Sequence, residues 1–311
     1  MRVWSLLLPC AAAMLLAGCV GFGDWGNSDR YKEDFHYSYD LAPGGTVSVE
    51  NFNGSVEVTG WDENRVEIDG TKYASREELL HALKVDVTPA SNYVTIRTNR
   101  PSMFHGNGGV RYSIRVPRKT TLDQISSSNG HIQIEDIDGT VRLRTTNGGV
   151  RVDRIRGRVD ATTSNGRIEA RDITGDLRVH TTNGAIDAQA QRGQFEAGTT
   201  NGSIEAELIQ PRKDWPVRVS STNGHISLDV RAADVPDVRA NTSNASITLR
   251  LPADANARVH AHTSHSSVRS DFDGLRPADS RDPHDLDGTL GSGGGYVDLS
   301  TTNGSIQIAK L

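Results

Sequence analysis

Three histidines near the C-terminal end form the sharpest group of potential metal ligands in this 311-residue sequence. His260 and His262 alternate along a segment typical of a strand, so they would share one face about 6.6 Å apart, and His265 would follow at the next corner. Imidazole nitrogen is a common zinc ligand. Histidines on the outer face of a sheet are, however, more often solvated polar residues. The sequence therefore predicts no metal and no cofactor, with these three residues as a weak candidate for a metal site.

Carboxylates are the other groups that could support catalysis. Enzymes built on parallel β-helices need clustered acids or a catalytic base in a groove. Here the acids alternate with arginines, so Asp160 and Asp176 are expected to be charge-pairing partners and not a catalytic pair. The aspartates of the 271–287 segment lack the fixed spacing of a calcium loop, and no G-x-S-x-G, Walker or H-E-x-x-H motif occurs in the sequence. We predict a protein that is not an enzyme, with a polysaccharide-active β-helix enzyme as an alternative.

Cys19 has the clearest expected chemistry. The chain begins with a short positive region, continues with an almost wholly apolar stretch over 3–16, and reaches the cysteine through Leu-Ala-Gly. This pattern indicates a secretory signal and not a membrane span, and residues 16–19 resemble the bacterial lipobox. The resemblance implies cleavage before Cys19 and attachment of lipid to it, which would anchor the chain in a membrane. An ordinary signal peptide with a chance cysteine is the alternative.

A repeat organises the rest of the chain. Glycine recurs at every ninth position from Gly130 to Gly202, and alternate glycines follow asparagine, so the true repeat unit is twice as long and contains two turns. Apolar and polar residues alternate between the turns, which indicates two short, half-buried strands per unit. We expect the Asn-Gly corners to form a structural turn ladder, whose members are Asn129, Gly130, Asn147, Gly148, Asn165, Gly166, Asn183, Gly184, Asn201, Gly202, Asn223, Gly224, Asn303 and Gly304.

Two architectures fit two strands and two turns per unit. Asn-Gly between alternating runs is a strong hairpin signal and favours an antiparallel β-meander. Against this, outward charges at steps of 18 alternate in sign, as in the column Arg142, Asp160 and Arg178. Alternation stabilises the fold only if these residues lie on adjacent strands about 4.8 Å apart. We therefore predict an all-β protein, a parallel β-solenoid (β-helix) of 18-residue, two-strand coils, with the meander as the alternative.

The expected layout has three parts: a lipoprotein signal peptide over 1–18, a flexible tether over 19–30, and a solenoid domain over 31–311 with regular coils over 126–210 and a long loop over 271–295. Aromatic residues make up only 5 % of the chain, which suits a narrow solenoid interior.

Both ends of the solenoid are expected to be closed. Residues 75–83 are the single predicted helix, with Ser75 as N-cap and Glu78 completing a capping box. The leucines of this helix are expected to cover one open end. The last strand pair, around the Asn303-Gly304 turn, is expected to cap the other end.

The segments VRYSIRVPRKTTLDQISSSNGHIQIEDIDGTVRLRTTNGGVRV and GTLGSGGGYVDLSTTNGSIQI resemble the bacterial putative-adhesin family of β-strand repeat proteins, a domain of unknown function similar to the head domain named for its Gly-Ile-Asn motif. The resemblance covers about residues 45–311. It implies a parallel β-solenoid at the cell envelope and supplies no catalytic residues. The corners Asn244-Ala245 and Ser264-His265 depart from the Asn-Gly pattern.

The anchor and the repeat together predict a lipid-anchored cell-envelope protein that acts as a non-catalytic interaction or adhesion module. We expect a membrane contact through Cys19 and a glycan, matrix or envelope-protein partner. The net charge of −5, without a basic patch, excludes nucleic acid. By the lipobox resemblance, Val20 in place of an aspartate after the cysteine implies the outer membrane. An envelope signalling or stress-response scaffold is the other alternative.

Overall fold

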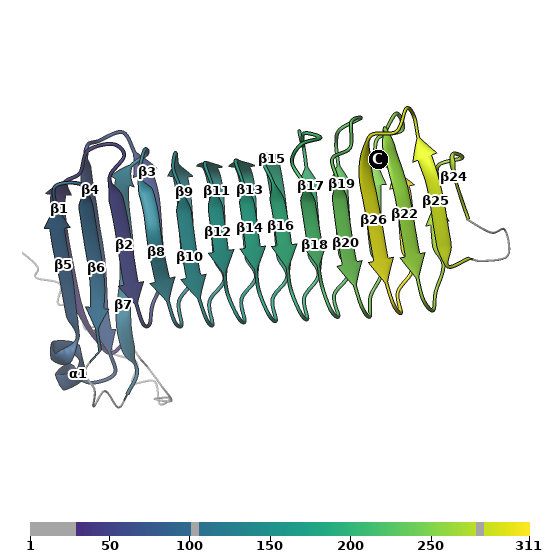
Figure 1. Cartoon of the computed structure of the whole chain (residues 1–311). Coiled ribbons are helices and arrows are strands. Elements are labelled where there is room, and N and C mark those ends of the chain that lie inside the picture. Colours follow the sequence, from purple (N-terminus) through teal and green to yellow (C-terminus); the bar gives the residue numbers. More distant parts are fainter. Residues whose placement is uncertain (1–28, 101–105, 278–282) are drawn as a thin grey trace, which may run out of the picture.

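The computed structural model describes residues 29–100, 106–277 and 283–311. They form an elongated solenoid in which two sheets face each other along the whole length (Figure 1). The signal peptide and nearly all of the predicted tether, including Cys19, lie outside the described residues.

Sheet A has thirteen strands, and their spatial order is not the chain order. In spatial order they are β1 (Tyr31–Asp40), β4 (Arg65–Ala74), β7 (Gly108–Pro117), β3 (Val56–Trp61), β9 (Ile132–Ile137), β11 (Val150–Arg156), β13 (Ile168–Thr174), β15 (Ile186–Arg192), β17 (Ile204–Leu208), β19 (Ile226–Val230), β21 (Ile247–Leu251), β27 (Ile306–Lys310) and β23 (Val268–Ser270).

Sheet B has fourteen strands and runs alongside sheet A. In spatial order they are β24 (Leu275–Pro277), β25 (Asp285–Leu290), β22 (Ala257–Thr263), β26 (Gly295–Thr301), β20 (Val238–Thr242), β18 (Val217–Ser220), β16 (Phe195–Gly198), β14 (Leu177–His180), β12 (Val159–Thr162), β10 (Val141–Thr145), β8 (Thr121–Ser127), β2 (Thr46–Asn51), β6 (Tyr93–Asn99) and β5 (Lys84–Ala90).

The predicted parallel solenoid is confirmed, and the meander is excluded for the regular coils. Strand β11 pairs in parallel with β13, so that Val150 lies beside Ile168, its equivalent in the next repeat. On sheet B the charge column has the predicted register, with Arg142 beside Asp160 and Asp160 beside Arg178. Each coil therefore contributes one strand to each sheet and stacks on the previous coil.

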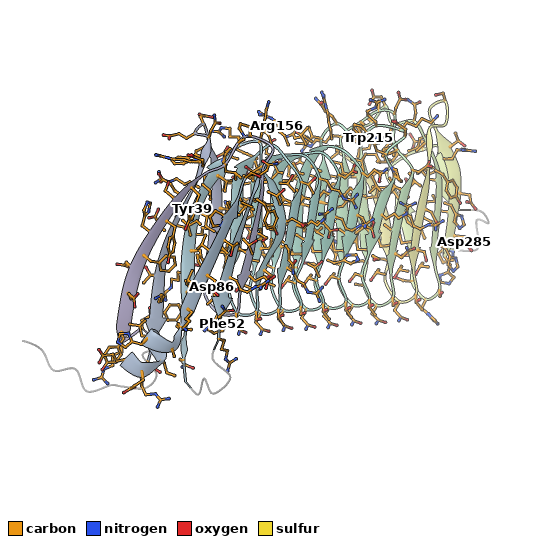
Figure 2. All side chains as sticks on the ribbon, turned by 60° about the vertical axis from the view of Figure 1, so that its left-hand side comes forward. Tyr39, Phe52, Asp86, Arg156, Trp215 and Asp285 are labelled. Carbon is orange, nitrogen blue, oxygen red and sulfur yellow. The ribbon has the colours of Figure 1, made fainter. Side chains whose placement is uncertain are left out.

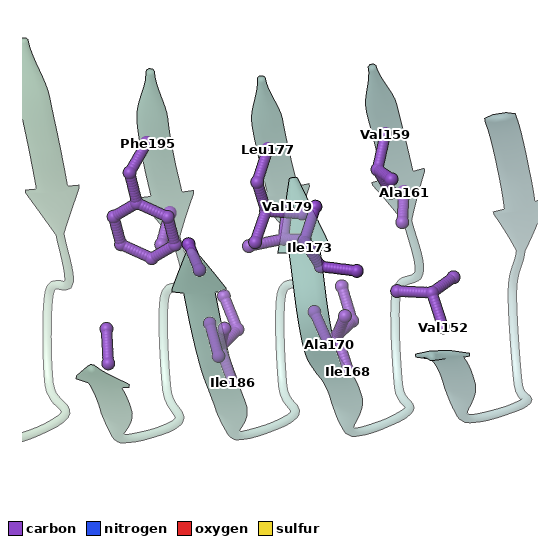
Figure 3. Packing of buried hydrophobic residues seen from close by; sticks show 14 of the residues in the cluster. Val152, Val159, Ala161, Ile168, Ala170, Ile173, Leu177, Val179, Ile186 and Phe195 are labelled. Carbon is purple, nitrogen blue, oxygen red and sulfur yellow. The ribbon is translucent and has the colours of Figure 1, made fainter. Parts of the chain in front are cut away.

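A single core runs between the sheets because alternate residues of every coil point inward. On sheet A the inward row contains alanine at positions 170, 188 and 206, whereas larger residues occupy this row in the coils on either side, Val152 and Leu228. On sheet B the bulkiest inward side chain of the regular coils is Phe195, which is 1 % exposed (Figure 3). Small residues on one sheet thus accompany a large residue on the other.

The C-terminal strand pair does not cap the domain, so that prediction was wrong. Strand β26 inserts between β20 and β22, and β27 inserts between β21 and β23. The coil formed by β22 and β23 therefore lies outside the last coil of the chain. Any coil with the common register can stack at this position, and the segment 271–294 between β23 and β26 is long enough for the chain to return.

The segment predicted as a loop over 271–295 contains two short strands. Strand β25 pairs antiparallel with β22, and β24 pairs antiparallel with β25. The Asp- and Gly-rich composition concealed them, because strand formation here depends on pairing with β22 and not on local propensity.

The N-terminal end also departs from the regular coil. Strands β1, β4 and β7 are antiparallel, as are β5 and β6. The helix α1 (Glu77–Ala82) is shorter than predicted and packs on β4 and β1 at one corner of the end (Figure 1). Its N-cap is Arg76 without a side-chain cap bond, so the capping box from Ser75 is wrong. The backbone N–H of Ser75 donates instead to the carbonyl of Asn107.

Candidate functional site

The Asn-Gly corners lie in a line along one edge of the solenoid, visible as a row of side chains along the lower edge in Figure 2. Each asparagine donates from Nδ2 to Oδ1 of the asparagine one coil before, at 2.6–2.8 Å. The bonded series is Asn129, Asn147, Asn165, Asn183, Asn201, Asn223, Asn244 and Asn303. Asn303 follows Asn244 because the last coil is inserted there, and Asn244 takes part although alanine replaces its glycine.

A buried row of hydroxyls lies just inside the asparagines. Thr181 donates to the carbonyl of Gly166 at 3.0 Å and accepts from the N–H of Gly184 at 3.2 Å. The corresponding threonines of the neighbouring coils, Thr163 and Thr199, also donate to a glycine carbonyl of the coil before. The hydrogen-bond partners of these threonines are backbone groups and not one another.

Glycine is required at the Asn-Gly corners by close approach. A Cβ on Gly184 would lie 1.8 Å from the carbonyl oxygen of Gly166, and the same holds at Gly148 against Gly130. At the opposite corners glycine is required for two reasons, since a Cβ on Gly175 would lie 2.1 Å from the carbonyl oxygen of Gly157 and Gly175 has a φ of +141°. The turn ladder is therefore needed for the coils to stack, and it also forms an exposed edge of the solenoid.

A groove of about 600 Å³ lies on the outer face of sheet A. It crosses β13, β15, β17, β19 and β21, a span of about 19 Å at ~4.8 Å per strand. The alanines at positions 170, 188 and 206, which are buried, contribute to its lining. The residues lining it are Ala170, Arg171, Asp187, Ala188, Gln189, Glu205, Ala206, Glu207, Ser227, Asp229, Arg231 and Arg250.

Most charged groups in the groove are paired. Asp229 meets Arg250 at 2.7 Å, and Glu207 accepts hydrogen bonds from Gln189 and Arg231. The Gln189 amide, followed by Arg231, lowers the pKa of Glu207. Glu207 therefore stays ionised at neutral pH, which is the opposite of what a general acid requires. Glu205 is exposed and, among the described residues, has no hydrogen-bond or ion-pair partner.

Sequence reasoning missed the groove, although two signals were present. Alanine recurs at positions 170, 188 and 206 in the inward row, at the repeat spacing of 18. The alternation of charge sign also fails in the outward row of sheet A, where Asp187 is followed by Glu205 and then by Ser227. A break in a regular charge column is a signal that the sequence could have provided.

The three candidate histidines do not form one metal centre, because each one bonds to a different neighbouring group. His260 meets Asp287 at 2.7 Å and His262 meets Asp285 at 2.5 Å, both from Nδ1 and across the β22–β25 ladder. His265 donates from Nδ1 to the carbonyl of Thr302 at 3.2 Å, at the corner. Within the described residues no three His, Cys, Asp or Glu side chains come together as metal ligands.

In the described ranges no helix is long and apolar enough to cross a bilayer. The only helix described is α1, which has six residues.

Comparison with known families addresses the regular coils. Residues 114–234 match the Toastrack DUF4097 family. The match runs from within β7 to just beyond β19, and it confirms the resemblance to a β-strand repeat family for which the sequence argued. None of the curated proteins compared matches the chain.

Several solved structures are similar over most of the chain. A putative adhesin from Parabacteroides distasonis is 11 % identical with a TM-score of 0.46, and the alignment covers 90 % of this chain and 97 % of that one. A putative lipid binding protein from the same species is 14 % identical, with a TM-score of 0.45 and coverage of 92 % and 98 %. A putative adhesin from Bacteroides fragilis is 12 % identical, with a TM-score of 0.41 and coverage of 90 % and 97 %. At these TM-scores the likenesses carry no argument about function.

Proposed function

We propose that this protein is a non-catalytic interaction module of the cell envelope, anchored by lipid on Cys19, whose sheet A groove binds an extended polar polymer such as a glycan. The observation that carries the proposal is the groove itself, which is long, open and polar and crosses five successive strands. The pairing of its carboxylates with arginines and the depressed pKa of Glu207 argue against catalysis.

The chemistry of the groove suits sugar hydroxyls, which both donate and accept hydrogen bonds. Arg171 and Gln189 can donate, and the carboxylate of Glu205 accepts without a competing partner in the described chain. Because the strands repeat at ~4.8 Å, successive units of a polymer meet polar groups at this regular spacing. Many weak and similar contacts then add to a useful avidity.

The groove is tested by binding the protein to immobilised envelope polysaccharides and comparing variants. Glu205→Ala and Arg171→Ala should each weaken binding about tenfold, the loss of one charge-assisted hydrogen bond. Glu57→Ala is the matched control, because Glu57 is exposed, lies in the same outward row of sheet A and is outside the groove. Absence of binding to every polysaccharide, or equal losses in all three variants, would contradict the proposal.

The anchor is tested separately with Cys19→Ser. This variant should lose incorporation of radiolabelled fatty acid and move from the membrane fraction to the soluble fraction. Retention of label would show that Cys19 is not the attachment site. Protease treatment of intact cells carrying a tag near Leu311 would then report whether the solenoid faces the exterior.

A further inference from the structure

The two ends of the solenoid differ in their free sheet edges. At the N-terminal end, β1 has ten residues and β5 has seven, and in the described chain each has a sheet neighbour on one side only. At the other end the edge strands β23 and β24 have three residues each. Short edges protect a sheet from pairing with other chains, whereas a long edge presents unpaired backbone groups.

An incompletely covered apolar row lies between the two long edges. Phe35, Tyr37 and Tyr39 of β1 point toward the interior, as do Val85 and Val87 of β5, and all five are only partly buried against the core. The core therefore continues to the N-terminal end of the solenoid and is open there. An exposed apolar surface of this kind is typical of an interaction site, and further strands would cover it.

We propose that a second copy of this chain covers this end, with β1 pairing antiparallel to β1 of the partner about a twofold axis normal to the sheets. Rotation about such an axis keeps each sheet at its own height, so sheet A meets sheet A and sheet B meets sheet B. Pro89 lacks a backbone N–H and confines pairing of β5 to its first residues, so β1 carries the contact. This inference does not depend on the proposed glycan binding.

The sequence of β1 is complementary to its own copy in the register centred on Phe35. On the outer face, Asp34 would lie opposite His36 of the partner subunit, and this pair occurs twice because of the symmetry. The Nδ1 atom of His36 is held by Asp69 at 2.7 Å, which leaves Nε2 for the partner. On the inner face Phe35 would meet its own copy, and Tyr31 would meet Tyr39 of the partner subunit. No like charges are opposed in this register.

Pairing of β1 with its own copy gives a closed assembly. It pairs the two ten-residue β1 edges with each other, and the outer ends of the dimer carry the three-residue edges. An isologous contact forms a dimer and not a filament. The dimer would double the length of the solenoid and place the two sheet A grooves on the same face.

Sedimentation velocity of the full-length chain in mild detergent measures the number of copies. We expect two copies per particle, and a dimer about tenfold weaker for Tyr37→Glu, which places a carboxylate in the inner row opposite Glu33 of the partner subunit. A single copy at all concentrations would overturn the proposal, including the case in which residues 1–28 of the same chain supply the neighbouring strand. An open-ended series of oligomers would also overturn it.

Disulfide cross-linking tests the register without disturbing the core. On a Cys10→Ser, Cys19→Ser background, which removes both natural cysteines, Asp34→Cys with His36→Cys should give a dimer on non-reducing gels. Arg142→Cys with Arg144→Cys is the control, because this exposed pair has the same spacing on β10, an interior strand. Equal dimer yields from the two pairs would overturn the assigned register.

Discussion

The buried hydroxyl row makes a quantitative prediction at two adjacent threonines. Thr181 is 7 % exposed and makes two hydrogen bonds to backbone groups of the corner, whereas the side chain of Thr182 is exposed and makes none in the described chain. Substitution by valine keeps the shape of either side chain. In Thr181→Val it leaves the carbonyl of Gly166 and the N–H of Gly184 without their partner.

The expected cost follows from these two bonds. Each lost bond costs about 1.5 kcal/mol, and the new buried methyl group recovers about 0.8 kcal/mol, so Thr181→Val should lower the free energy of unfolding by about 2 kcal/mol. For a domain of this size that lowers the melting midpoint by about 3–4 °C. Thr182→Val should change stability by less than about 0.5 kcal/mol. Thermal melts followed by circular dichroism measure both variants, and equal midpoints would refute the assigned role of the buried row.

Three further predictions concern the stacking, the core and the charges. Gly148→Ala should prevent or severely destabilise folding, because its Cβ would lie 1.8 Å from a backbone carbonyl oxygen. Gly149→Ala should be tolerated, because its Cβ would meet the His131 ring at 3.1 Å and the carbonyl oxygen of Arg167 at an ordinary contact distance of 3.4 Å; soluble yield and melting midpoints compare the two. Phe195→Ala should cost about 3–5 kcal/mol in a denaturant titration, and a cost below about 1 kcal/mol would show that the core collapses around the site. Hydrogen bonds from Arg154 lower the pKa of Asp136, so the ionised carboxylate stabilises the fold above its ordinary pKa of 3.8 and this contribution is lost as pH falls through the folded-state value. The stability difference between the parent and Arg154→Ala should therefore shrink in melts below about pH 4, and a constant difference would contradict this assignment.

Much of the fold follows from the repeat period. The period gives the coil, the register and the parallel pairing, because side chains one coil apart must be compatible neighbours on a sheet. The charge pair Arg178 and Glu196 shows this, since the two occupy equivalent positions in successive repeats and meet at 2.9 Å.

The remaining features depend on tertiary contacts that cannot be predicted from the local sequence. Strand β26 has the same register as any other coil, so nothing in its residues specifies that it inserts beside β20. Ser75 and Glu78 satisfy a capping pattern, yet pairing of β4 with β7 continues to Ala74 and determines the backbone before the helix. The groove on sheet A is lined in part by small residues of a buried row, and a search for catalytic or metal-binding motifs does not detect such a feature.

The central claim, that the sheet A groove binds an extended polymer, is tested most directly by the dependence of affinity on ligand length. Calorimetric titration with an oligosaccharide series from a polysaccharide that binds should show affinity rising with each added sugar until the ligand spans about 19 Å, and then levelling off. The rise should be lost in Glu205→Ala and retained in Glu57→Ala. An affinity independent of ligand length, or an unchanged rise in Glu205→Ala, would contradict the claim.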